Sequence, residues 1–386
     1  MEKQKKIPKL RFPEFEGEWI QEKLDDVASK IQDGTHFSPE LLVEGKFLYI
    51  TSKNVKNGYI DLSDSYYVSY EDHKNIYKRC DTKKGDVLLT KDGTIGQASI
   101  NTLSEEISLL SSVAFIRAKD KYLNEFICQL LLSPEGQREI KKSIAGQALK
   151  RITLTKIKNF NYYFPSLPEQ QKIASFFTAI DQKISQLKRK LTLLEEYKKG
   201  VMQKIFSQEI RFRDDNGQEF PKWEKKKLKD VAEIKYGKDQ KGIACENGQY
   251  PILGTGGVMG RTNEFLSDKP SVLIGRKGTI DKPFFIDTPF WTVDTLFYTI
   301  VLSNVNAKWL YYNLIKVDWY KYNEASGVPS LSTSTINKIP INLPSIGEQT
   351  RIANFLSAID DKINCTQKQI EKAGVWKKGL MQQMFC

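Results

Sequence analysis

The chain has 386 residues, of which 40% are hydrophobic and 27% charged, and its formal net charge is +12. This length and composition predict two or three globular domains and exclude an intrinsically disordered chain, while the basic excess indicates a polyanionic partner. The five scattered cysteines and two histidines argue against a disulfide framework or a zinc site, and the lack of a long apolar run or an apolar signal segment predicts a cytoplasmic protein without a membrane span.

Residues 1–165 form the first predicted domain. Strand-like apolar runs occur at Phe47 to Ile50, Val87 to Thr90 and Val113 to Ile116, and a helical stretch follows at Tyr122 to Leu132. Glycine-rich turns separate these runs. We therefore expect a compact α+β domain with a curved sheet and short helices.

Residues 166–207 form a predicted long helix. Ser166 and Glu169 have the S-x-x-E spacing of a capping box, which satisfies free amides at a helix start. From Ile173 to Ile205, apolar residues recur at alternating steps of three and four and miss only at Lys198, which is the pattern of a coiled-coil seam. A helix of this length would span about 60 Å. It could therefore serve as a spacer.

Residues 208–344 form a second predicted α+β domain, which contains short echoes of the first. The run VLIGRKGTI, from Val272 to Ile280, matches VLLTKDGTI, from Val87 to Ile95. Further strand-like and helical stretches lie at Phe297 to Val301 and Ala307 to Ile315. Most of the rest of this block has diverged from the first.

Residues 345–386 repeat the long helix. The run from Pro165 to Ile184 returns at Pro344 to Ile363, a shift of 179 residues (344 − 165), and 18 of the 42 aligned positions from 165 to 206 are identical. Such self-similarity indicates an internal repeat. Since neither apolar seam can stay in water, we expect the two helices to pair as an antiparallel coiled coil. The alternative is that each helix packs on the domain before it.

This layout and the repeated E-Q-x-x-I-A-x-F-x-x-A-I-D-x-K-I blocks resemble the specificity subunit of type I restriction-modification enzymes over the whole chain. The resemblance implies two target recognition domains, 1–165 and 208–344, which read the halves of a split DNA site, and two conserved spacer helices, 166–207 and 345–386. It also implies that the chain is not catalytic and binds no cofactor itself. Two modification subunits would use S-adenosylmethionine to methylate adenine, and restriction subunits would use ATP and Mg²⁺ to cut DNA.

The predicted DNA contacts lie in glycine turns and in the segments before each long helix. Glycine lets the backbone approach a phosphate closely, and Arg or Lys can donate hydrogen bonds to guanine in the major groove. An ordinary exposed hairpin turn is the alternative for these loops. The candidates are Lys53, Asn54, Lys91, Gly93, Thr94, Gln147, Lys150, Arg151, Thr255, Gly256, Arg276, Lys277, Gly278 and Thr279.

Polar identities shared by the two helix copies indicate a partner surface that is presented twice, because packing alone would keep only the apolar seam. Some of these residues would instead cap the helices. The predicted partner contacts are Glu169, Gln170, Lys183, Lys199, Gln203, Glu348, Gln349, Lys362, Lys378 and Gln382.

Two other classes of function fit the sequence less well. A catalytic nuclease or methyltransferase would need a cofactor loop or a carboxylate set, but the glycine run from Gly254 to Gly260 is followed by a stretch too broken for the required helix. Asp215 with Glu224 and Lys226 is more typical of a solvated charged face. A coiled-coil scaffold without a DNA role is the second alternative, and it predicts no sequence preference in DNA binding.

Overall fold

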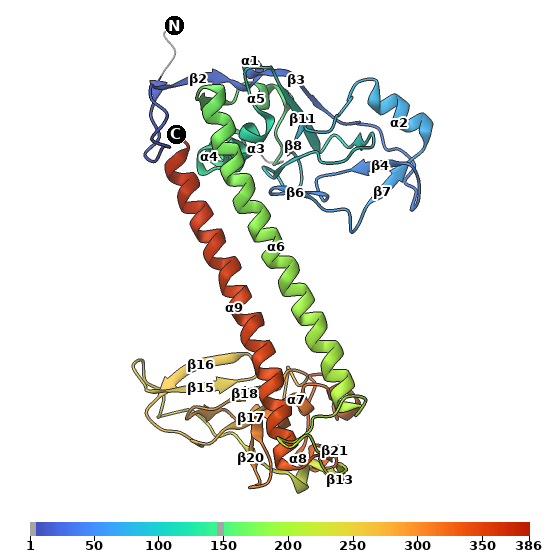
Figure 1. Cartoon of the computed structure of the whole chain (residues 1–386), viewed down its shortest axis with the longest axis vertical. Helices are drawn as coiled ribbons and strands as arrows, with labels where there is room; N and C mark the ends of the chain where they lie inside the picture. Colours follow the sequence, from blue (N-terminus) through green and yellow to red (C-terminus); the bar gives the residue numbers. More distant parts are fainter. Residues whose placement is uncertain (1–4, 145–149) are drawn as a thin grey trace. The chain divides into compact units, whose positions relative to one another are not determined.

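The computed structural model describes residues 5–144 and 150–386, and it divides into two compact units (Figure 1). Unit 1 comprises Met1–Arg189 with Gln367–Cys386, and unit 2 comprises Lys190–Thr366. Each long helix is divided between the two units. The first part of α6 (Leu167–Phe206) and the last part of α9 (Ile346–Met384) belong to unit 1, and the remaining parts belong to unit 2.

Unit 1 is built around the four-stranded antiparallel sheet β3-β11-β8-β9. A second sheet, β10-β4-β7, carries a parallel pair, and the small sheet β1-β2-β12 closes the domain next to the start of α6. The elements before α6 are β1 (Lys5–Lys6), β2 (Trp19–Lys23), α1 (Leu24–Val27), β3 (Ala28–Asp33), β4 (Phe47–Ile50), β5 (Val55–Lys56), β6 (Tyr59–Ile60), β7 (Tyr66–Val68), α2 (Tyr70–Tyr77), β8 (Val87–Thr90), β9 (Ala98–Ile100), β10 (Ser108–Leu109), β11 (Val113–Ala118), α3 (Asn124–Leu132), α4 (Pro134–Ile144), α5 (Leu154–Lys158) and β12 (Asn161–Phe164).

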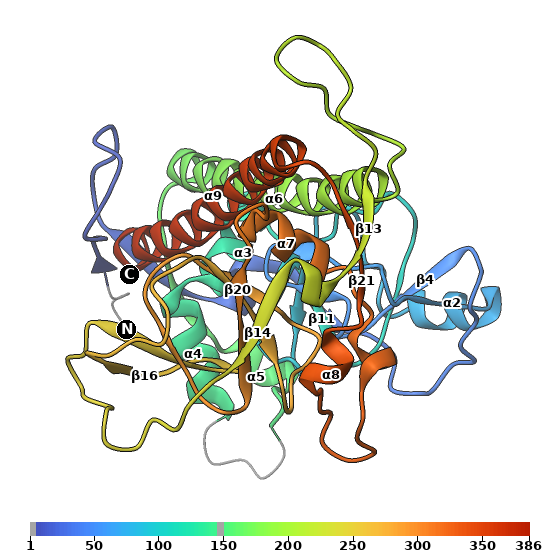
Figure 2. The ribbon, with the colours of Figure 1, turned by 90° about the horizontal axis from the view of Figure 1, so that it is seen from below.

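Unit 2 repeats this plan with the sheets β14-β20-β17-β18, β16-β15-β19 and β13-β21. Figure 2 shows β14 beside β20, and the two strands pair in antiparallel register from Ala232↔Val301 to Tyr236↔Phe297. The elements of this domain are β13 (Glu224–Lys227), η1 (Leu228–Asp230), β14 (Ala232–Tyr236), β15 (Tyr250–Gly254), β16 (Gly257–Thr262), β17 (Ser271–Gly275), β18 (Phe284–Ile286), β19 (Trp291–Thr292), β20 (Leu296–Val301), α7 (Ala307–Leu314), η2 (Trp319–Tyr322), α8 (Thr333–Ile336) and β21 (Pro340–Leu343).

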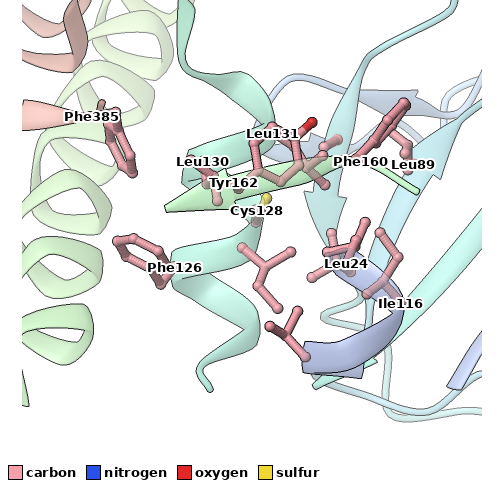
Figure 3. Close-up of a cluster of buried hydrophobic side chains, with 14 of the residues drawn as sticks. Leu24, Leu89, Ile116, Phe126, Cys128, Leu130, Leu131, Phe160, Tyr162 and Phe385 are labelled. Atoms are coloured by element: carbon pink, nitrogen blue, oxygen red, sulfur yellow. The ribbon is translucent and has the colours of Figure 1, made fainter. Parts of the chain in front are cut away.

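The apolar seams of α6 and α9 are buried toward the helix ends, where the helices pack on the domains, and half-buried between them. In unit 1 the first part of α6 and the last part of α9 meet: the ring of Phe177 lies 5.7 Å from that of Phe385, which also contacts Phe126 of the domain (Figure 3). In unit 2 the last part of α6 packs with the first part of α9, where Ile205 and Leu356 share one core. The predicted α+β class and the antiparallel helix pair are confirmed. The alternative also holds in part, since each helix also packs on the domain before it.

Candidate DNA-recognition site in each unit

The order of the strands brings distant loops of unit 1 together. Asp33 ends β3 and pairs with Ala114, and Thr90 ends β8 and pairs with Val113, so both strands finish beside the start of β11. Lys91 follows Thr90 directly, and its Nζ lies 3.1 Å from Oδ2 of Asp33. A residue from β3 and one from β8 therefore meet at one edge of the sheet.

Two further loops join this edge in unit 1. The Thr94 hydroxyl donates to the Ser52 carbonyl at 2.8 Å, and the amide of Ile152 donates to the Lys91 carbonyl at 2.8 Å. Gly93, at φ +70°, has the left-handed backbone that glycine adopts without strain, and a Cβ there would lie 2.9 Å from the Ser52 hydroxyl. We call residues 51–54, 91–94 and 150–152 the three-loop site of unit 1. It unites three of the segments predicted to contact DNA.

The corresponding loops of unit 2 meet in the same way. Tyr236 and Gly275 end β14 and β17 beside the start of β20. The amide of Leu331 donates to the Arg276 carbonyl at 2.9 Å, and Gly278, at φ +85°, lies beside Thr255, whose Oγ1 would be 3.8 Å from a Cβ at that glycine. We call residues 254–257, 276–279 and 329–331 the three-loop site of unit 2.

Most of the predicted DNA contacts in these sites reach solvent. Lys53, Gly93, Thr94, Lys150, Arg151, Gly256 and Lys277 are exposed, and Thr255, Arg276, Gly278 and Thr279 are half-buried. Gln147 lies outside the described residues. Exposed cations and turn backbones next to one another are suited to phosphate and base contacts.

Two residues predicted to contact DNA, Asn54 and Lys91, have buried side chains whose polar groups bind other residues of the same domain. Asn54 is 3% exposed; its side-chain oxygen accepts from the Thr51 amide at 2.9 Å and its side-chain nitrogen donates to the Asp61 carbonyl at 3.1 Å. Lys91 is 8% exposed, and its ammonium pairs with the buried Asp33. We therefore correct the prediction for both side chains: they hold the three-loop site of unit 1 in shape.

Two further side chains contact Asp33, and of these only Arg79 was not indicated by a sequence pattern. Arg79 reaches its Oδ1 at 2.6 Å, and Nε2 of His36 lies 3.3 Å from its Oδ2. Both are exposed at this edge. Arg79 lies in a stretch without a repeat or a glycine turn that could have marked it, whereas His36 follows Gly34 in the run from Asp33 to Pro39. Asp33 gathers both side chains only in the folded sheet.

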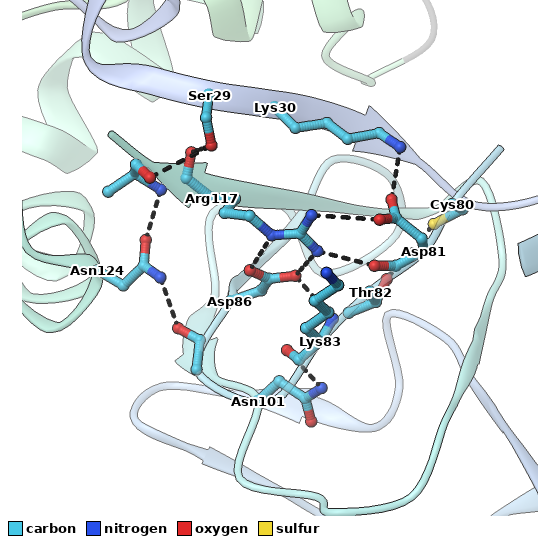
Figure 4. A network of polar contacts seen from close by, with 12 residues as sticks. Ser29, Lys30, Cys80, Asp81, Thr82, Lys83, Asp86, Asn101, Arg117 and Asn124 are labelled. Carbon is cyan, nitrogen blue, oxygen red and sulfur yellow. Dashed lines mark hydrogen bonds and ion pairs between the residues drawn. The ribbon is translucent and has the colours of Figure 1, made fainter. Parts of the chain in front are cut away.

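A buried polar network fixes the strands that carry the unit 1 site (Figure 4). The guanidinium of Arg117 on β11 donates to both carboxylate oxygens of Asp86, which directly precedes β8, at 2.9 and 2.7 Å. The same guanidinium contacts Asp81, which also pairs with Lys30 of β3. Donation to the Asp86 carboxylate raises the pKa of Arg117. Strands β3, β8 and β11 are thus tied together by charge as well as by backbone pairing.

The recurring glutamates of the two long helices are buried clamps. Glu169 is 1% exposed and accepts hydrogen bonds from Arg11, at 2.8 and 2.7 Å, and from the indole of Trp19 at 3.2 Å. Glu348 is fully buried and accepts from Arg211, at 3.1 and 2.7 Å, and from Trp223 at 2.9 Å. Donating hydrogen bonds to these carboxylates raises the pKa of both arginines. The glutamate side chains therefore do not complete a reciprocal capping box. Each one instead joins the start of its helix to the arginine and tryptophan at the beginning of its own domain.

The glutamines beside them are also internal. Gln170 accepts from the Leu123 amide at 3.0 Å and donates to the Pro165 carbonyl at 3.0 Å. Gln349 accepts from the Asn306 amide at 2.8 Å and donates to the Pro344 carbonyl at 2.9 Å. The prediction that Glu169, Gln170, Glu348 and Gln349 form a partner surface is therefore corrected, because all four are at most 1% exposed.

Another recurring pair joins the helices within each unit. Lys377 lies 2.7 Å from Asp181 in unit 1, and Lys198 lies 2.5 Å from Asp360 in unit 2. These ion pairs explain why the apolar seam is interrupted at Lys198. The remaining predicted partner contacts, Lys183, Lys199, Gln203, Lys362, Lys378 and Gln382, are exposed. Of these, Lys378 and Gln382 line a groove in unit 1, and Lys199 and Gln203 line the corresponding groove in unit 2.

The features weighed for catalysis have simpler structural explanations. The glycine run from Gly254 belongs to the hairpin of β15 and β16 and opens no helix. Asp215 is exposed and pairs with Arg351, and Glu224 pairs with Lys226. Within residues 5–144 and 150–386, no cluster of three or more His, Cys, Asp or Glu side chains could hold a metal ion. In the same described part of the chain, no helix is long and apolar enough to cross a membrane.

Comparison with known proteins agrees with this geometry. Residues 16–196 and 221–373 match the family described as type I restriction modification DNA specificity domain. The MjaVIII type I restriction enzyme specificity subunit of Methanocaldococcus jannaschii is 24% identical, over 98% of this chain and 93% of that protein.

Two solved structures share the fold. The S subunit of a type I restriction-modification system from M. genitalium superimposes with a TM-score of 0.68 at 18% identity, over 98% of this chain and 99% of that one. A chain from a structure on complex assembly and conformational transition of the type I R-M system gives a TM-score of 0.52 at 15% identity, over 95% of this chain and 97% of that one.

The chain belongs to the type I restriction modification DNA specificity family, and it carries the family's domain twice. It is a specificity subunit of the type I restriction-modification kind, whose role is to give DNA sequence specificity.

Proposed function

We propose that each unit reads one half of a bipartite DNA site through its three-loop site. The observation that carries the proposal is the recurrence of the same three loops, at the same sheet edge, in two domains that have otherwise diverged in sequence. Equivalent backbones with different exposed side chains are suited to reading two different base sequences.

We further propose that the chain is not catalytic and acts in the cytoplasm, and that partner subunits perform the chemistry. Two modification subunits would bind S-adenosylmethionine and methylate adenine, and restriction subunits would use ATP and Mg²⁺. The exposed pair Lys378 and Gln382 and its repeat counterpart Lys199 and Gln203 support two equivalent docking places for one kind of partner.

Methylation mapping tests this function. The chain is expressed with its modification subunit, and methylated adenines are located in the host DNA. We expect one split motif, and exchanging residues 208–344 for another recognition domain should change only one half of it. A contiguous motif, or a change in both halves, would contradict the proposal.

A further inference from the structure

Lys91 and Arg276 occupy the same place in the two units. Each directly follows a central strand, β8 or β17. The carbonyl of each accepts a hydrogen bond from the segment before a long helix, from Ile152 or from Leu331. The backbone is thus equivalent, and only the side chains differ.

The residues that face these two side chains are equivalent as well. Asp33 precedes Gly34, whose amide donates to the Val113 carbonyl at 3.2 Å; Tyr236 precedes Gly237, whose amide donates to the Leu296 carbonyl at 3.2 Å. Both carbonyls belong to the residue that starts the central strand β11 or β20. Unit 1 therefore places an Asp–Lys pair where unit 2 places a Tyr–Arg pair.

The Asp–Lys pair of unit 1 is closed to a ligand. The Asp33 side chain is 4% exposed and that of Lys91 is 10% exposed, and their charged atoms lie 3.1 Å apart. Moving the ammonium of Lys91 toward a base would leave the buried carboxylate of Asp33 with less compensation, which is costly. The Lys91 ammonium is therefore held at Asp33 and is not available to contact a base.

The Tyr–Arg pair of unit 2 is open. The guanidinium carbon of Arg276 lies 5.4 Å from the centroid of the Tyr236 ring, and its side chain is 30% exposed. One of its nitrogens donates to the Asp294 carbonyl at 3.0 Å, while the Asp294 carboxylate is 3.9 Å away and 70% exposed. A guanidinium carries five N–H donors in one plane, so most of them remain available. The cation–π contact with Tyr236 orders the Arg276 side chain before DNA arrives, which lowers the entropic cost of binding.

We propose that Arg276 reads a guanine in the half-site bound by unit 2, that Tyr236 positions it, and that Lys91 makes no base contact. A planar fork with two parallel donors fits the N7 and O6 acceptors of guanine in the major groove. The inference rests on the proposed function, since it assumes that unit 2 binds one half-site.

The test uses the full chain in complex with its modification subunit. Each guanine of the second half-site is replaced in turn by 7-deazaguanine, which lacks the N7 acceptor, and binding is measured. We expect replacement of one particular guanine to weaken binding of the wild-type complex roughly 10-fold. The same replacement should not weaken binding of the Arg276→Ala complex further. On natural DNA, that variant should bind roughly 10- to 100-fold more weakly, the usual discrimination of a bidentate pair.

Three variants separate base reading from other roles. Arg276→Lys keeps the charge but not the fork, so it should lose the guanine preference and keep the salt dependence. Tyr236→Leu should weaken the same preference, whereas Tyr236→Phe, which keeps the ring, should retain it. Lys91→Ala, which removes a support of the unit 1 site, should leave the preference for the guanine read by unit 2 unchanged.

Arg276→Ala could instead weaken binding to all sequences equally and lower the salt slope by about one, as expected for a phosphate contact. That result, or 7-deazaguanine sensitivity that survives in Arg276→Ala, would overturn the proposal. Failure of the proposed function would look different, because the wild-type complex would then bind DNA without any sequence preference.

Discussion

At the sheet edge of unit 1 a buried Asp–Lys pair is surrounded by Arg79 and His36, whereas at the same edge of unit 2 the Arg276 guanidinium lies over the Tyr236 ring, with the exposed Asp294 carboxylate 3.9 Å away. The strand order, the glycine turns and the hydrogen bonds to the segments before the long helices are the same in both. The glutamate clamps and the Asp–Lys pairs between the helices are also the same. The chain has thus kept the residues that attach each domain to the helices, and it has changed the residues that face outward.

The glutamate clamps give the most stringent test of that equivalence. Glu169→Gln and Glu348→Gln each leave a partly buried arginine without its anionic partner, so each should lower the free energy of unfolding of its own unit by about 3 kcal/mol. Hydrogen exchange measured unit by unit reports both effects. Glu196→Gln, at an exposed position of α6, is the control and should change little. A loss in only one unit would break the equivalence.

Lys91 and Arg276 should differ in what they do for stability. Lys91→Met removes one partner of the buried Asp33, which keeps Arg79 and His36, so we expect a loss of about 2 kcal/mol in unit 1. Arg276→Met removes a partly exposed side chain and should stay within about 0.5 kcal/mol. Urea unfolding of the two variants makes the comparison, and equal losses would contradict it.

The two ion pairs between the helices should each stabilise their unit less than the glutamate clamps do, and by similar amounts. Their side chains are between 15% and 30% exposed, so solvent screens them. A double-mutant cycle on Asp181→Asn with Lys377→Gln should give a coupling energy of about 1 kcal/mol, and one on Asp360→Asn with Lys198→Gln the same. Coupling energies that differ by more than about 0.5 kcal/mol would show that the two units do not hold the helices in the same way.

Lys316 provides the smallest expected effect, a pH dependence in unit 2. Its Nζ lies 3.9 Å from the centroid of the Phe206 ring, and burial lowers its pKa to about 8. The unfolded chain keeps this proton up to about pH 10.5, so between about pH 8 and 10.5 it binds more protons than the folded chain, and the contribution to stability rises with pH. Because the site is only partly buried, Lys316→Met should stabilise unit 2 near neutral pH by a few tenths of a kcal/mol and remove this rise.

Thermal unfolding midpoints measured across that range test the prediction. Lys282→Met, at an exposed position of the same unit, is the matched control and should leave the rise intact. An unchanged pH profile in Lys316→Met would rule out Lys316 as its source.

The sequence by itself determined the architecture, because helix periodicity and the strand-and-glycine pattern from Val87 to Ile95 are local signals, and the 179-residue repeat is found by comparing the sequence with itself. It also marked the loops that the structure brings together. Only the tertiary structure decided what the polar side chains in them do. Lys91 and Asp33 are 58 residues apart (91 − 33), and Arg11 and Glu169 are 158 residues apart, so their pairing depends on strand register and on the packing of helix starts against the domains. Burial then separated residues that looked alike in the sequence, since a charge that the fold encloses must find its partner inside, whereas one left at the edge can bind DNA.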